Sequence, residues 1–146
     1  MKINFKKCIE NKKIFKADEA KFLVDKEMKL AAQDLEEALE RLEAKKYRWP
    51  TIQCYYSMFH SARALLYSKG YRERSHICLV EAIRELFVKD GTLPKEIVEI
   101  FSKSKLLRED ADYKGDFTED NAKVLADFAK IFLDNVKEIL NRKLRS

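Results

Sequence analysis

Apolar side chains recur at steps of three and four residues along much of this chain, and this spacing places them on one face of an α-helix. The longest stretch with the pattern runs from Asp18 to about Lys46 and contains neither Gly nor Pro. We therefore expect a long helix there, and a short helix over residues 3–10. The apolar stripe of the long helix consists of Met28, Ala31, Leu35, Ala38 and Leu42.

Two amphipathic stretches joined near Gly70 form the centre of the chain, from Trp49 to Gly91. Pro50 fits the first turn of a helix, where its missing N–H costs nothing. Gly70 can adopt the left-handed conformation that ends many helices, and Ser75 is the candidate N-cap of the next one. The predicted apolar faces are Ile52, Tyr55, Phe59, Ala62 and Leu66 in the first helix and Ile77, Val80, Ile83 and Phe87 in the second.

Two more helices are expected in the last third of the chain, one from Pro94 into Arg108–Tyr113 and one from the Thr118 cap to about Lys143. No segment alternates with period two, so strands are not expected. We predict an all-α fold: an up-and-down bundle of four long helices with a further short helix near the N-terminus. The inward faces of the last two helices are Ile97, Ile100, Phe101, Ser104 and Leu107, and then Leu125, Phe128, Phe132, Val136 and Ile139.

The composition suits one domain over residues 1–146, because 46% of the side chains are apolar and 38% are charged. No run of about 18 apolar residues is present, and the N-terminus lacks the apolar core and cleavage site of a secretory signal. We therefore expect no membrane association and a cytoplasmic location. The cysteines are Cys8, Cys54 and Cys78, and this odd count without a framework spacing favours reduced thiols, with Cys54 and Cys78 in the core.

The positive charge is concentrated at the N-terminus. The net charge is +5, and residues 1–16 already contain six lysines against the single acid Glu10. We expect residues 1–17 to form a basic, partly ordered segment of the domain. A solvated helix face explains this charge, and a patch that attracts RNA phosphates is the functional alternative.

Two sequence motifs resemble a known family. They are YYSMFHSARALLYSKGYRERSH at 55–76 and LREDADY at 107–113. The aromatic-rich helix, the Gly turn, the Ser-His pair and the distant Arg-to-Tyr motif together resemble the HEPN domain family, and within it the small stand-alone prokaryotic proteins. The resemblance extends over roughly residues 5–140. It implies a helical bundle, frequent homodimers, and roles in RNA cleavage or toxin–antitoxin systems.

In the ribonucleases of that family, an Arg is followed four to six residues later by a His, and the two copies meet at a dimer interface. Arg can hold the scissile phosphate, and His can move protons to and from the ribose hydroxyl and the leaving oxygen. Here Arg108 is followed by Tyr113, and tyrosine is a poor general base because its reference pKa is about 10. We take Arg108, Tyr113 and Asp112 as candidate catalytic residues. The alternative, slightly preferred, is an Arg–Asp–Tyr network that holds the helix end and the dimer contact.

A second group of residues could bind a phosphate or a nucleotide. Arg72, Arg74 and His76 lie at a predicted helix start, where backbone N–H groups also favour anions. His76 could instead make a structural hydrogen bond. His60 and Arg63 share a helix face and could line the same pocket, although a histidine there is more often a buried residue with satisfied hydrogen bonds.

No metal or cofactor site is expected, because the cysteines and histidines lack paired ligand spacing and no Gly-rich phosphate loop occurs. The sequence therefore favours an RNA-associated HEPN protein, acting as a homodimer. It would be the toxin-like ribonuclease of a pair whose partner is a small nucleotidyltransferase of the MNT type. The alternative is a non-catalytic module that binds a nucleotide or another protein.

Overall fold

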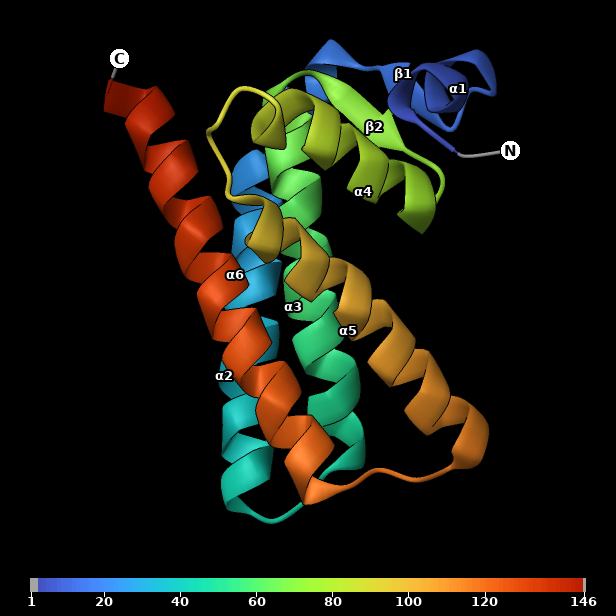
Figure 1. The fold of residues 1–146 in the computed structure, drawn as a ribbon. Coiled ribbons are helices and arrows are strands. Elements are labelled where there is room, and N and C mark those ends of the chain that lie inside the picture. The colour runs from blue at the N-terminus through green and yellow to red at the C-terminus, as the bar shows by residue number, and fades with distance from the viewer. Residues whose placement is uncertain (1–2, 146) are drawn as a thin grey trace.

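The computed structural model describes residues 3–145, and its main body is a bundle of four long helices (Figure 1). Helices α2, α3 and α6 lie side by side. Helix α5 packs against α3 and α6 at its start and then diverges from them. The architecture confirms the predicted all-α up-and-down bundle. The long helices are α2 Val24–Glu43, α3 Arg48–Ser68, α5 Lys95–Lys114 and α6 Glu119–Arg145.

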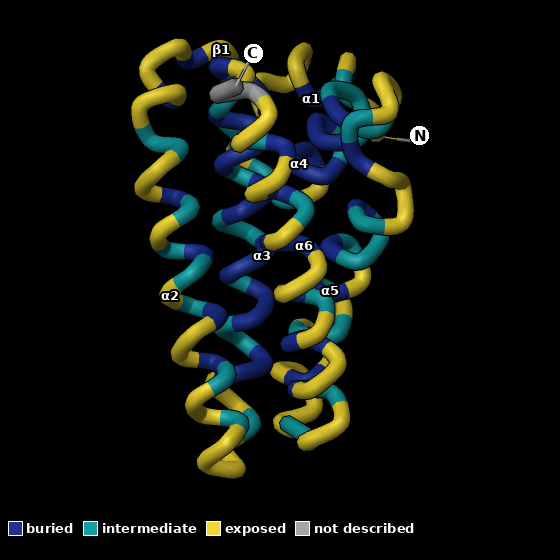
Figure 2. Tube along the Cα trace, turned by 90° about the vertical axis from the view of Figure 1, so that its left-hand side faces the viewer, coloured by how far each residue is buried: buried dark blue, intermediate teal, exposed yellow. Residues whose placement is uncertain are grey.

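Helix α3 forms the centre of the bundle and is buried along most of its length (Figure 2). Cys54, Met58 and Leu65 lie outside its predicted stripe and are nevertheless fully buried. Two members of that stripe, Ile52 and Phe59, are only partly buried. A helix covered by neighbours on several sides must be apolar nearly all round, so the single-stripe interpretation was too narrow.

Shorter elements form a layer at the end of the bundle where α2 begins and α3 ends. Strands β1 and β2 pair antiparallel there, with Phe15 opposite Arg72. The expectation of no strands is therefore wrong at this point, because three-residue strands are too short to show a period of two. The elements are α1 Phe5–Glu10, β1 Ile14–Lys16, the 3₁₀ helix η1 Asp18–Leu23, β2 Tyr71–Glu73, α4 His76–Ile83 and the π-helical turn η2 Arg84–Val88.

Several predicted caps and turns are confirmed. The Ser75 hydroxyl accepts a hydrogen bond from the backbone N–H of Cys78 at 3.3 Å, and the Thr118 hydroxyl accepts one from Asn121 at 3.1 Å. Gly70 has a φ of +79°, and a Cβ there would lie 3.0 Å from a carboxylate oxygen of Asp18. The turn after α3 therefore requires glycine for its conformation and for space.

A disulfide between Cys8 and Cys78 joins α1 to α4, with the two Cα atoms 5.7 Å apart. The prediction of reduced thiols is wrong for this pair, because a separation of 70 residues gives no local signal in the sequence. Cys54 is free and buried, as expected. Ile77, next to the disulfide, was expected to face inward but is 49% exposed.

Candidate functional site

Arg108 lies on α5 over two adjacent tyrosines of α3. Its guanidinium carbon is 5.2 Å from the ring centroid of Tyr55 and 5.2 Å from that of Tyr56. Its Nε lies 3.4 Å from a carboxylate oxygen of Asp112, one turn further along the helix. The side chain is 26% exposed. Arg108 is thus oriented by two rings and a carboxylate while part of its surface stays accessible, which suits a group that holds a phosphate.

Tyr113 does not share these contacts. It is 92% exposed, on the outer face of α5, where it borders a shallow hollow with Leu106 and Asp110. The structure therefore brings Arg108 and Asp112 together and leaves Tyr113 facing outward. In this position Tyr113 is accessible to a second molecule.

Tyr55 connects the Arg108 site to His76. The Tyr55 hydroxyl and Nδ1 of His76 are 2.8 Å apart, and the His76 ring centroid lies 4.8 Å from that of Phe101. Sequence reasoning assigned Tyr55 to the core, and its exposure of 5% agrees. It missed that the ring also supports Arg108. The Tyr55–Tyr56 pair within the aromatic-rich helix was the only available signal.

The pKa shifts keep both partners of this hydrogen bond neutral. Burial, together with the charge of Lys105, lowers the pKa of His76 to about 4, and burial raises the pKa of Tyr55. At pH 7 the bond therefore joins a neutral hydroxyl to a neutral imidazole, and which of the two donates depends on the tautomer of His76. The other ring nitrogen, Nε2, is buried and has no hydrogen-bond partner in the described part of the chain.

We expect His76 to stay neutral throughout the physiological pH range, titrating at about pH 4. Histidine ring NMR signals measured against pH test this directly, since the chain contains only two histidines. The variant His60→Gln leaves a single histidine and so assigns the signal. A midpoint near the ordinary value of about 6.5 contradicts the proposed environment.

His60 and Arg63 lie in a largely buried ion-pair network that joins α2, α3 and β2. Nδ1 of His60 is 2.6 Å from a carboxylate oxygen of Glu27, and its Nε2 is 3.8 Å from Asp34. Arg63 lies 3.6 Å from the second oxygen of Glu27 and 3.3 Å from Glu73. Glu27 is 6% exposed. These contacts give His60 the satisfied partners that a structural histidine needs.

The network sets the ionisation of Glu27. Burial alone would raise the pKa of this carboxyl, but the hydrogen bond with His60 and the charge of Arg63 outweigh it and hold the pKa below its ordinary value. At Glu73 the balance is reversed, because burial raises the pKa more than Arg63 lowers it. Folding therefore favours the charged form of Glu27 and disfavours the charged form of Glu73.

Replacing Glu27 with Gln is expected to lower the free energy of unfolding by about 1–3 kcal/mol at neutral pH, because His60 and Arg63 lose a buried charged acceptor. Folding lowers the pKa of this carboxyl, so its contribution is present above pH 4.5 and is lost as the pH falls through the folded-state value. Urea denaturation at neutral pH and in acid measures the effect. Glu138→Gln, at an exposed ion pair, is the control. An equal deficit at both pH values contradicts the prediction.

The two remaining candidates point elsewhere. The guanidinium carbon of Arg72 lies 5.2 Å from the ring centroid of Tyr67, and that of Arg74 lies 4.5 Å from that of Phe15. Neither arginine lines the cavity beside His76. The structure thus does not gather Arg72, Arg74 and His76 into one phosphate site.

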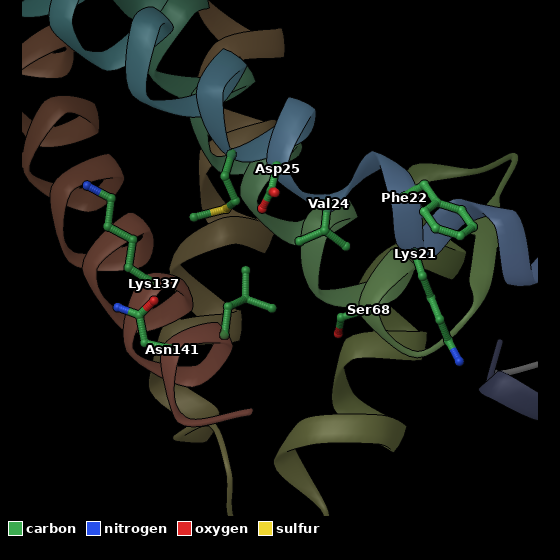
Figure 3. A pocket seen from close by; sticks show the side chains of 9 residues that line it. Lys21, Phe22, Val24, Asp25, Ser68, Lys137 and Asn141 are labelled. Atoms are coloured by element: carbon green, nitrogen blue, oxygen red, sulfur yellow. The ribbon is translucent and has the colours of Figure 1, made fainter. Parts of the chain in front are cut away.

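A cavity of about 700 Å³ lies at the junction of η1 and α2 with the ends of α3 and α6 (Figure 3). None of the candidate site residues lines it. Within residues 3–145, no group of three or more His, Cys, Asp or Glu side chains could hold a metal ion, and no helix is long and apolar enough to cross a membrane. The cavity is lined by Lys21, Phe22, Val24, Asp25, Met28, Ser68, Lys137, Leu140 and Asn141.

Comparison with known proteins gives consistent matches. A family model described as the HEPN domain matches residues 24–140. A protein of Methanocaldococcus jannaschii named "Putative toxin" is 33% identical over 118 residues, which cover 80% of this chain and 88% of that protein. A second protein of the same organism, also described as a putative toxin, is 26% identical over 122 residues, which cover 82% of this chain and 83% of that protein.

Proposed function

Because this chain belongs to the HEPN domain family, we propose that it is a toxin-like protein that binds RNA and cleaves it. The observation that carries the proposal is the placement of Arg108, which two tyrosine rings and a carboxylate hold at the surface. The names of the two Methanocaldococcus jannaschii relatives support the toxin-like role.

In the proposed reaction, the ribose 2′-oxygen forms a bond to the adjacent phosphorus while the bond from that phosphorus to the 5′-oxygen of the next nucleotide breaks. The products are a 2′,3′-cyclic phosphate and a 5′-hydroxyl, whose oxygen takes its proton from solvent water. Arg108 binds the phosphate and stabilises the charge that develops on its oxygens. Asp112, 3.4 Å from Arg108, is a carboxylate that can accept the proton of the 2′-OH. Tyr113 can donate a hydrogen bond to a phosphate oxygen. The nucleophile is part of the substrate, so a metal-bound water is not required.

We also propose that two copies associate through the outer face of α5. Two large side chains stand exposed there, Leu106 at 65% and Tyr113 at 92%. A two-fold contact over these side chains would cover apolar surface and bring Tyr113 of each copy towards the partner's Arg108 site. Light scattering should show a dimer, and Leu106→Glu should shift it to a monomer. A wild-type monomer at high concentration contradicts a shared site.

The proposed partner is an antitoxin, a small nucleotidyltransferase of the MNT type, as the HEPN resemblance implies. The second candidate function is a non-catalytic module that binds a nucleotide, and the tyrosine at position 113 favours it, since the family's ribonucleases carry a histidine there. A purified protein that leaves RNA intact, yet whose melting temperature rises with added nucleotide, would select this alternative.

The decisive assay incubates the purified protein with labelled RNA in the presence of a metal chelator. We expect cleavage products that end in a 2′,3′-cyclic phosphate. The matched control is the same RNA with a 2′-deoxy nucleotide at the cleavage site, which cannot react because it lacks the nucleophile. RNA that stays intact with excess protein, or equal cleavage of the deoxy substrate, overturns the proposed reaction.

A further inference from the structure

A cavity of about 210 Å³ lies between α4 and α5, beside the Arg108 site. We infer that it receives one unstacked base of a single-stranded RNA whose phosphate lies at Arg108. The inference rests on the proposed function in taking RNA as the ligand. It goes further in assigning a base-binding site to residues that the Arg-to-Tyr motif does not include.

The size and walls of the cavity fit a flat ring. Its volume is smaller than the roughly 300–1,000 Å³ typical of pockets that hold a whole ligand. Ile77, Val80 and Leu106 supply apolar surface. Ile77, which is 49% exposed and lies outside the proposed dimer contact, borders the cavity on the side of α4, so an RNA base can enter there from solvent.

The polar groups of the cavity suit the edge of a base. Nε2 of His76 is buried without a partner, so a ligand group that hydrogen-bonds to this nitrogen would satisfy it. The Ser102 hydroxyl can donate or accept, and Glu81, whose Oε1 is paired with Arg84, has a second carboxylate oxygen that can accept. A base edge presents donors and acceptors side by side, and this mixed set matches it.

The charges favour a base over a phosphate as the occupant. Arg84 is the strongest cation on the wall, but it is engaged by Glu81 at 2.7 Å and by Glu99 at 3.0 Å. Lys105 is paired with Glu109 at 2.9 Å. With its cations already neutralised and a carboxylate on the wall, the cavity offers little attraction to a free anion.

The cavity and the arginine site are connected through Tyr55, which contacts a residue of each. Tyr55 bonds His76 through its hydroxyl and supports Arg108 on its ring. Lys105, which lines the cavity, precedes Arg108 by three residues and so lies on the same side of α5. A phosphate held by Arg108 therefore leaves its attached nucleotide within reach of the cavity.

Binding of short single-stranded RNA, measured by fluorescence anisotropy, tests the inference. The two probes are an oligomer with all bases and a matched oligomer with one abasic position. The wild type should bind the intact oligomer about tenfold more tightly, which is the usual effect of one well-seated base. Ser102→Phe fills the cavity and should abolish the preference. The matched variant Ser102→Ala leaves the space open and should keep most of it.

Equal affinity of the wild type for the two oligomers overturns the inference, as does an unchanged preference in Ser102→Phe or a failure to bind RNA. If Ser102→Phe does not fold, the NMR ring signal of His76 in the wild type tests the inference instead. This signal must shift when the intact oligomer is added and must stay in place with the abasic oligomer. RNA cleavage is measured in a separate assay with labelled RNA. A base preference without cleavage overturns the ribonuclease proposal alone, and cleavage without a preference overturns only this inference.

Discussion

Replacing Arg108 with Ala is expected to lower the rate of RNA cleavage by about 100-fold or more while the fold stays intact. The guanidinium is the only group of the proposed reaction that can offer two parallel hydrogen bonds and a full positive charge to the phosphate. Its stacking on Tyr55 and Tyr56 fixes its direction before RNA arrives, so little reorganisation is needed during the reaction. Single-turnover cleavage of labelled RNA measures the loss.

Two controls separate this role from a general effect of charge. Arg142→Ala removes an exposed arginine that is paired with Glu138 on α6, and it should leave cleavage unchanged. Arg108→Lys keeps the charge but loses the planar fork, so it should recover only part of the rate. Circular dichroism should show the same helix content in all three variants. Cleavage by Arg108→Ala at the wild-type rate removes this residue from the mechanism.

The geometry of a helix explains why Arg108 and Tyr113 lie on different sides of α5 within one copy of the chain. Successive residues turn by about 100°, so Asp112, four residues after Arg108, lies about 40° away around the axis, whereas Tyr113 lies about 140° away. The structure shows this result, with Asp112 in contact and Tyr113 at 92% exposure. If Tyr113 acts at an Arg108 site, it must do so from a second copy, and the proposed dimer therefore has a mechanistic reason.

The long helices were predictable because their signals are local. The stripe of α6 and the caps at Ser75 and Thr118 depend on residues a few positions apart, and the structure bears them out. The burial of α3 all round and the pairing of β1 with β2 were not predictable in this way. They depend on which segments meet in space, and this sequence gives no sign of that.

In the candidate site, too, some features could be predicted from the sequence and others depend on the packing of distant segments. Arg108 and Asp112 follow from helical spacing, but the placement of Tyr55 between Arg108 and His76 requires the packing of α3 against both α4 and α5. His60 and Arg63 share a helix face, as predicted, yet that face meets Glu27 on α2 rather than the Arg108 site. The periodicity of the sequence shows which residues share a face of a helix, but it does not show which other element packs against that face.

Of the interactions described above, the disulfide is expected to contribute most to the free energy of unfolding. It closes a separation of 70 residues between Cys8 and Cys78. Loop-closure entropy for a loop of that length gives about 4 kcal/mol. The double variant Cys8→Ser with Cys78→Ser should therefore unfold at lower urea concentration, and its melting temperature should fall by roughly 10 °C. The bond also fixes the start of α4, where His76 lies two residues before Cys78.

A reductant provides the matched test of this contribution. Dithiothreitol should lower the stability of the wild type to that of the double variant and should leave the double variant unchanged, because Cys54 is free and buried in both. Since His76 depends on the position of α4, reduction should also move its NMR ring signal. Thiol titration of the unfolded wild type must give one free thiol before reduction and three afterwards. Three thiols before reduction, or a wild type whose unfolding ignores the reductant, contradicts a stabilising link between α1 and α4.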